Sequence, residues 1–75
     1  MSEHLDLTGL KCPLPVLRTR KALRSLMAGA VIEVSCTDPM SAIDIPNMVR
    51  EEGDSLIEQR KDAARLVFRI RKGGR

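Results

Sequence analysis

The spacing of hydrophobic and polar residues changes several times along this chain, and each stretch of regular spacing predicts one helix or strand. Residues 4–8 alternate between apolar and polar side chains, which predicts a half-buried strand. Residues 31–37 are rich in β-branched side chains and predict a second strand, central in its sheet. The segment between them, residues 13–27, has apolar positions at helical spacing and predicts an amphipathic helix ended by Gly29. The side chains expected on the buried face of this helix are Val16, Thr19, Leu23, Leu26 and Met27.

Prolines mark a second helical segment. Asp38 precedes Pro39, and Asp44 stands two residues before Pro46, so each pair resembles a helix start in which aspartate accepts free amide protons. A proline inside a helix removes a hydrogen bond and clashes with the preceding turn. We therefore expect a short helical turn, a kink near Asp44 and a helix to residue 52. This interpretation makes both aspartates caps, and it is favoured over a functional carboxylate pair.

Two strands complete the chain, at residues 55–60 and 65–72, joined by a turn at residues 62–64. The last strand directs one set of side chains toward the core and the other toward water. The inward set is Leu66, Phe68 and Ile70, and the outward set is Arg65, Arg69 and Arg71. The tail, residues 73–75, is expected to be loose.

The predicted order is strand, helix, strand, helix, strand, strand. This order fits an α/β (α+β) two-layer sandwich, in which a four-stranded mixed sheet carries both helices on one face and leaves the other face in water. Seventy-five residues leave room for a single domain, residues 1–75.

Composition supports a folded chain and excludes several other classes. Apolar residues make up 43% and charged residues 31%, which is typical of a globular protein. The longest apolar run, residues 27–32, is too short for a membrane span or a signal-peptide core, so we expect a cytoplasmic protein without a membrane partner. The net charge of +3 favours acidic partners without requiring nucleic acid.

The chain has two cysteines, Cys12 and Cys36, and both are expected to be free thiols. Together with the single His4 they do not make a clustered ligand set, so neither a metal site nor a bound cofactor is expected. Cys36 continues the inward row of Ile32 and Val34, which predicts a buried and inert side chain.

Cys12 is the candidate reactive group. It stands directly before Pro13, and if Pro13 is the first helical residue, the sulfur lies at a helix N-terminus, where free amides stabilise an anion. Lys11 adds a positive charge, so Lys11 and the helix start at Pro13 are expected to stabilise the thiolate and lower its pKa. Pro13 and Pro15 stiffen the segment that presents the thiol to solvent.

Three thiol chemistries can be compared. A Cys/His hydrolase needs a base in reach, but His4 lies about 13 Å of extended chain before the end of the first strand. A dithiol oxidoreductase needs a second cysteine where this chain has Pro15. A single activated thiol that holds a persulfide and passes its outer sulfur to another thiolate needs no base, metal or cofactor on this chain.

Four motifs resemble, in order and over nearly the whole chain, those of the TusA/SirA family of sulfur carriers. They are Cys12-Pro13-Leu14-Pro15, Asp38-Pro39, Asp44-Ile45-Pro46 and Ile70-Arg71-Lys72-Gly73-Gly74. The resemblance implies the same two-layer fold, and a cysteine that accepts sulfane sulfur from a cysteine desulfurase or rhodanese-type donor.

The resemblance also implies how the chain works. Cys12 relays the sulfur to an acceptor protein in tRNA thiolation, cofactor synthesis or sulfur oxidation. The chain is then a carrier with a covalent persulfide, rather than an independent turnover enzyme. We expect a monomer, since a carrier must dock successive partners.

One residue departs from the branch of the family that serves tRNA thiolation: Leu14 stands where glutamate is typical. Leu14 and Leu17 lie off the core stripe of the first helix, beside Lys21 and Arg24. These four residues are a candidate docking surface, an apolar patch with a basic rim. The alternative is that single exposed leucines are ordinary features of a protein surface.

A second hypothesis is a regulatory or RNA-binding module that uses the arginines of the last strand. Direct nucleic-acid binding is disfavoured, because RNA recognition commonly stacks bases on aromatic side chains, and the single aromatic residue, Phe68, is assigned to the core.

Overall fold

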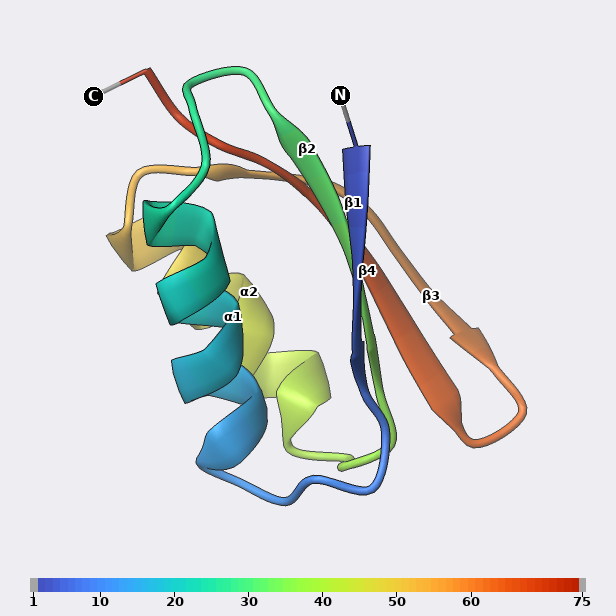
Figure 1. Ribbon diagram of the computed structural model, residues 1–75. Coiled ribbons are helices and arrows are strands. Elements are labelled where there is room, and N and C mark those ends of the chain that lie inside the picture. Colours follow the sequence, from blue (N-terminus) through green and yellow to red (C-terminus); the bar gives the residue numbers. More distant parts are fainter. Residues whose placement is uncertain (1, 75) are drawn as a thin grey trace.

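The structure is a computed structural model that describes residues 2–74. Its elements follow in the predicted order (Figure 1). Their bounds are β1 Ser2–Leu7, α1 Leu14–Arg24, β2 Val31–Cys36, α2 Ser41–Glu51, β3 Ser55–Asp62 and β4 Arg65–Arg71. No helix within residues 2–74 is long and apolar enough to cross a bilayer.

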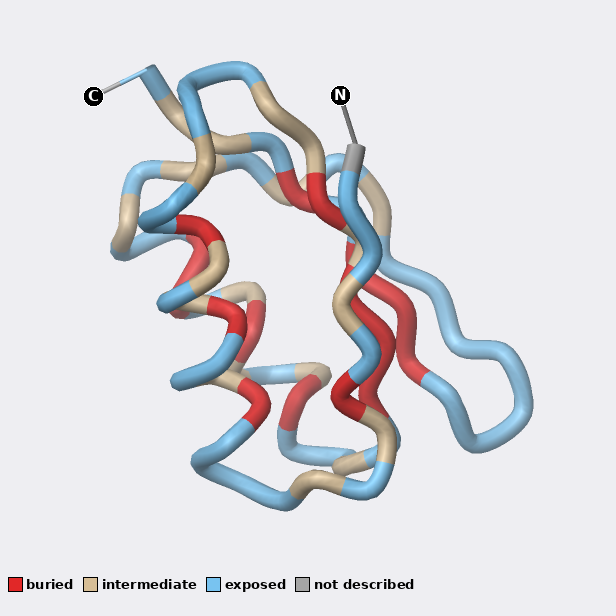
Figure 2. The backbone as a smooth tube through the Cα atoms, in the orientation of Figure 1, coloured by how far each residue is buried: buried red, intermediate tan, exposed pale blue. Residues whose placement is uncertain are grey.

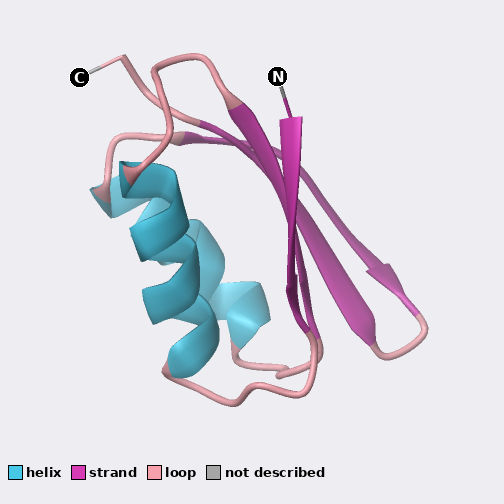
Figure 3. Cartoon of the chain, in the orientation of Figure 1, coloured by secondary structure: helices cyan, strands magenta, loops and turns pink. Residues whose placement is uncertain are grey.

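The four strands form one mixed sheet in the order β1-β2-β4-β3. β1 pairs with β2 in parallel, and β4 is antiparallel to both β2 and β3. Both helices lie on the same side of the sheet (Figure 3). The predicted two-layer sandwich is therefore confirmed, with β2 as a central strand.

The core lies between the helices and the sheet, where the buried parts of the chain face one another (Figure 2). The predicted inward row of β4 is confirmed, since Phe68 and Ile70 are fully buried and Leu66 is 8% exposed. The helices contribute side chains at helical spacing to the same core, which include Leu23, Ile45, Met48 and Val49. Burial of this apolar surface is what holds the two layers together.

The first helix is shorter than predicted. It ends at Arg24, because both the backbone N–H and the hydroxyl of Ser25 bond to the carbonyl of Ala22 and the chain then turns away. Met27 therefore does not continue the helical face, and its side chain is 82% exposed. The assignment of Met27 to the core was wrong because it extrapolated the helical period beyond the point where the backbone leaves it.

The second helix is one continuous element, Ser41–Glu51, and the second helix start expected at Asp44 lies inside it. Pro46 lies inside α2 and cannot donate to the carbonyl of Ala42, four residues earlier. The side-chain amide of Gln59 on β3 donates to that carbonyl at 3.3 Å. A long-range hydrogen bond thus satisfies the acceptor that Pro46 leaves open, and the helix runs through.

The C-terminal segment is more ordered than predicted. The backbone N–H of Gly73 donates to Asp54 Oδ1 at 2.7 Å, and the N–H of Lys72 donates to the carbonyl of Ala30 at 2.8 Å. A side chain at position 73 would overlap the carbonyl of Gly53. The expectation of a loose tail is therefore wrong for Gly73, and Arg75 lies outside the described residues.

The turn between β3 and β4 contains a strained residue. Ala63 has a φ of 58°, in the left-handed region that is unfavourable for a residue with a Cβ. Its neighbour Ala64 does not have a positive φ. The turn therefore contains one position that suits glycine and an adjacent one that does not require it.

Ala63→Gly is expected to raise the free energy of unfolding by about 0.5–1 kcal/mol, because glycine adopts a positive φ without steric cost and this gain exceeds its larger chain entropy. Urea denaturation monitored by circular dichroism measures the change. Ala64→Gly is the matched control and should lower stability slightly. Equal effects of the two substitutions would contradict this account of the turn.

Candidate functional site

Two loops meet at one end of the molecule, and together they form the candidate site. One loop joins β1 to α1 and the other joins β2 to α2; because these strands are parallel, their carboxyl ends lie at the same edge (Figure 1). The backbone N–H of Gly9 donates to Thr37 Oγ1 at 2.8 Å, and the N–H of Cys12 donates to Asp38 Oδ2. The two loops are thereby fastened to each other at the cysteine.

Cys12 is exposed and precedes the helix, as predicted, but it does not adjoin the first helical residue. Pro13 has φ −97° and ψ 11°, so it is the residue before the helix, and α1 begins at Leu14. The N–H of Leu14 closes a turn onto the carbonyl of Lys11 at 2.9 Å, and Pro15 is buried in the first turn. The prediction that Pro13 starts the helix and brings the sulfur to its N-terminus is wrong by one residue.

Two carboxylates lie against Cys12. The thiol donates to Asp44 Oδ2 across 3.4 Å. Asp38 accepts the Cys12 N–H with one oxygen and the Met40 N–H, at 3.1 Å, with the other. Asp38 thus caps the turn that leads into α2, as predicted, and also holds the cysteine loop.

Asp44 has a different role from the one predicted. It lies within α2, where its own N–H bonds to the carbonyl of Met40, so it does not begin a helix. Its side chain is directed to Cys12 instead. The structure therefore places the Asp44 carboxylate, like that of Asp38, at Cys12, and the capping role expected for Asp44 is wrong.

The electrostatic environment of Cys12 is opposite to the predicted one. The hydrogen bond to Asp44 raises the pKa of the thiol, and partial burial and the negative charges of Asp44 and Asp38 act in the same direction. The prediction that Lys11 and the helix start lower this pKa is therefore wrong. The prediction failed because the two carboxylates come from a segment some thirty residues away in the sequence. The residues around Cys12 do not show that this segment packs against the thiol.

Cys12 opens into a hollow of about 360 Å³ that is formed by the two loops. Its lining residues are Gly9, Leu10, Lys11, Cys12, Thr37, Asp38, Pro39 and Met40. Lys11 thus lies in the site as predicted, as a cation at its wall. The hollow makes the thiol accessible to an incoming group.

Exposed apolar side chains lie on both helical segments that follow the two loops of the site. Leu14 and Leu17 on α1 are 42% and 47% exposed. The structure adds two side chains that the sequence did not single out, Met40 and Ile43, which are 48% and 58% exposed near the start of α2. The sequence signal that could have identified them is that Met40 and Ile43 are apolar residues three positions apart at the start of the second helical segment.

The two basic residues predicted for this surface differ in their contacts. Lys21 is exposed on α1. Arg24 donates two hydrogen bonds to Glu52, at 3.0 and 3.2 Å, and this carboxylate raises the pKa of the guanidinium. Arg24 therefore joins the end of α1 to the end of α2, while its side chain remains 64% exposed, and its part in docking stays a prediction.

The second cysteine is fully buried, as predicted. Burial raises the pKa of Cys36 and so disfavours its thiolate. Cys12 is therefore the exposed one of two free thiols. Within residues 2–74, no three His, Cys, Asp or Glu side chains lie close enough together to hold a metal ion.

The arginines of β4 are exposed on the open face of the sheet, as predicted, but carboxylates lie among them. Glu58 pairs with Arg60 at 3.2 Å and with Arg69 at 3.6 Å. Asp62 lies opposite Arg65 in the strand register. The face is mixed in charge rather than uniformly basic, which gives little support to an RNA-binding role.

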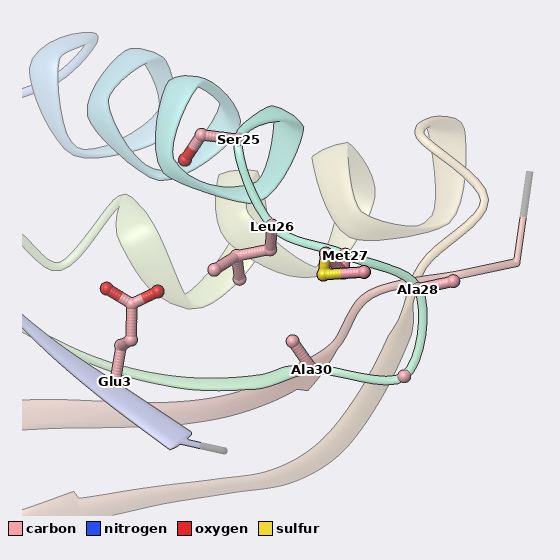
Figure 4. Close-up of a pocket in the computed structure, with 7 residues that line it drawn as sticks. Glu3, Ser25, Leu26, Met27, Ala28 and Ala30 are labelled. Carbon is pink, nitrogen blue, oxygen red and sulfur yellow. The ribbon is translucent and has the colours of Figure 1, made fainter.

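A larger hollow, of about 660 Å³, lies around Glu3 and the loop after α1 (Figure 4). Leu26, Met27 and Ala30 contribute to its wall, and the hydroxyl of Ser25 donates to the carbonyl of Ala22. No cysteine lines it. The exposed thiol, Cys12, lies at the smaller hollow.

The chain is similar to known proteins over nearly its whole length. A family model described as sulfurtransferase TusA matches residues 3–72. A sulfur carrier protein TusA of Allochromatium vinosum is 37% identical over 70 residues, which cover 93% of this chain and 92% of that protein. A sulfur carrier protein TusA of Pseudomonas putida is 41% identical over 68 residues, 91% of this chain and 85% of that protein. A crystal structure of a SirA-like protein from Desulfitobacterium hafniense has a TM-score of 0.83 at 32% identity, over 95% of this chain and 97% of that one.

The carboxylates beside Cys12 predict a measurable pH dependence. In a Cys36→Ser background, alkylation of Cys12 by iodoacetamide should rise at a higher pH in the folded protein than in the chain unfolded in urea, because Asp44 and Asp38 raise the pKa of the folded thiol. The raised pKa also makes the free energy of unfolding depend on pH. The Cys12 thiol contributes its full stabilisation below the pKa that it has in the unfolded chain, and this contribution is lost as the pH rises through its pKa in the folded protein. A folded profile that inflects at the same pH or lower contradicts the prediction.

Proposed function

The chain belongs to the TusA family of sulfurtransferases, and from this membership we propose that Cys12 carries sulfur, as a persulfide, from a donor protein to an acceptor protein. The observation that supports Cys12 is that it is the exposed thiol in an open hollow, whereas Cys36 is fully buried. A carrier cysteine has to be reached by two partners in turn, and an exposed thiol on a loop is suited to that.

The proposed cycle consists of two thiol–persulfide exchanges. In the first, the sulfur of Cys12 attacks the outer sulfur of the donor persulfide, and the donor cysteine leaves with the electron pair of the broken S–S bond. In the second, a thiolate of the acceptor attacks the outer sulfur now on Cys12, and Cys12 is regenerated. Each step breaks one S–S bond and forms another, so the carrier needs no external oxidant or reductant.

This cycle makes the protein a covalent carrier rather than an independent turnover enzyme. The donor is a protein that presents a persulfide, such as a cysteine desulfurase or a rhodanese-like protein, and the acceptor presents a thiol. The carrier acts as a monomer of one domain, residues 1–75, in the cytoplasm, where thiols are kept reduced. Since the exchange is between thiols, no metal or cofactor takes part.

The apolar side chains near Cys12 provide a surface for these partners. Leu14 and Leu17 from α1 and Met40 and Ile43 from α2 are all at least 42% exposed. Met40 lines the same hollow as Cys12, and Leu14 follows Cys12 by two residues in the sequence. Grouped apolar residues with a cation such as Lys21 at the rim are typical of protein interfaces.

The carrier function is tested by intact-mass measurement after incubation with a cysteine desulfurase and cysteine. Wild type should gain one sulfur, because the donor persulfide reaches the exposed thiol. Cys12→Ser should gain none, and Cys36→Ser, the matched control, should gain one as wild type does. Absence of a gain in every variant, with a donor shown to carry a persulfide, would overturn the proposal.

Docking through α1 is tested by Leu17→Asp, which places a charge in the apolar surface. The rate of sulfur uptake from the desulfurase should fall about tenfold or more, as for the loss of a central interface contact, while the melting temperature stays close to that of wild type. Ile57→Asp is the matched control, because Ile57 is 42% exposed but lies on β3, and it should leave uptake unchanged. Equal rates for both variants would exclude Leu17 from docking.

A further inference from the structure

The carboxylate of Asp44 occupies an unusual place for a carrier whose cysteine has to react as a nucleophile. Its Oδ2 atom lies 3.4 Å from Cys12 Sγ, within reach of the thiol proton. A negative charge at this distance disfavours the thiolate, which is the reactive form. The contact therefore opposes ionisation in the free carrier, and it also places a proton acceptor directly beside the sulfur.

The two carboxylates at Cys12 differ in how they are held. Asp38 accepts two backbone N–H groups, from Cys12 and Met40, and both of its oxygens have structural partners. Asp44 accepts the thiol, and in the part of the chain that the structure describes neither aspartate forms an ion pair with a cation. Asp44 is therefore the carboxylate that can exchange a proton without breaking the loop apart.

The geometry points to Asp44 as a catalytic residue of sulfur uptake: its carboxylate keeps the proton on the Cys12 thiol in the free carrier and receives that proton when Cys12 attacks the donor. This inference rests on the proposed function of Cys12. Asp38 is a positioning residue, since it holds the backbone of Cys12 in place for the hydrogen bond. Lys11, at the wall of the same hollow, is the nearby cation.

The uptake step balances with Asp44 as the proton acceptor. Cys12 Sγ forms a bond to the outer sulfur of the donor persulfide, the S–S bond of the donor breaks, and its electron pair leaves on the donor cysteine as a thiolate. The proton of Cys12 moves to Asp44 Oδ2. The products are a persulfide on Cys12, a protonated Asp44 and a donor thiolate, so the charge and the number of protons are unchanged. Asp44 then loses its proton to water or to the donor thiolate.

Docking of a partner would favour this transfer. A protein that docks at Cys12 removes water from the half-buried Asp44 beside it, and loss of water makes a carboxylate a stronger base. The same carboxylate that restrains the thiol in solution would then become a better proton acceptor in the complex. Restraint in the free carrier and assistance in the complex are thus two consequences of one hydrogen bond.

The test compares two reactions of Asp44→Asn. Alkylation of the free carrier by iodoacetamide at neutral pH should be about eightfold faster than in wild type, which is the effect of removing one charge 3.4 Å away across solvent. Sulfur uptake from a persulfide-loaded cysteine desulfurase should be about tenfold slower, because the proton acceptor is lost. The pH profile of alkylation should also shift to lower pH. A residue that only maintains the loop would not move the two rates in opposite directions.

Two further variants serve as controls. Asp44→Glu keeps a carboxylate at this position and should leave both rates within about twofold of wild type. Glu51→Gln removes a charge from the same helix about 10 Å further along and should change neither rate. The melting temperature of each variant verifies that it is folded.

The outcomes separate the alternatives. Both rates rising in Asp44→Asn would overturn the role as proton acceptor, and alkylation that is unchanged or slower would overturn the restraint. If wild type itself takes up no sulfur, the proposed function fails, and the alkylation rates still decide whether Asp44 holds the thiol proton.

Discussion

The position of Cys12 depends on the carboxylate of Asp38, which bonds to the backbone of the β1–α1 loop and to the turn that begins the α2 segment. Cys12 has no secondary structure of its own to hold it, because α1 starts only at Leu14. Parallel pairing of β1 with β2 brings the two loops to the same edge of the sheet, and Asp38 then joins them. The cysteine loop is thus fixed by its neighbour rather than by its own helix.

The same arrangement decides the character of the thiol. A segment that carries Asp38 also brings Asp44 to the sulfur one helical turn and a half later, so the site that holds Cys12 also surrounds it with negative charge. This raises the pKa of the thiol, in contrast to cysteines at helix starts that are activated by nearby cations. In the mechanism proposed above, the nucleophile of the carrier is therefore restrained while no partner is present.

Two side-chain contacts outside the site hold α2 in the position that brings Asp44 to Cys12. Gln59 on β3 satisfies the carbonyl that Pro46 leaves open, which allows the helix to remain continuous from the turn of Asp44 onward. At the other end of the helices, Arg24 of α1 is bonded to Glu52, just after α2. The two helices are therefore connected at both ends, at Cys12 through Asp44 and at Arg24 through Glu52.

The sequence by itself determined the order of the elements, the single sheet with both helices on one face, the burial of Cys36 and Phe68, and the exposure of Cys12, because all of these follow from local period, proline position and chain connectivity. Only the tertiary structure decided that Asp44 meets Cys12 and that Pro46 lies inside a helix. Both depend on contacts between residues 17 to 32 positions apart. Local patterns describe how a segment folds, but the charge that a thiol meets depends on which distant segment packs against it.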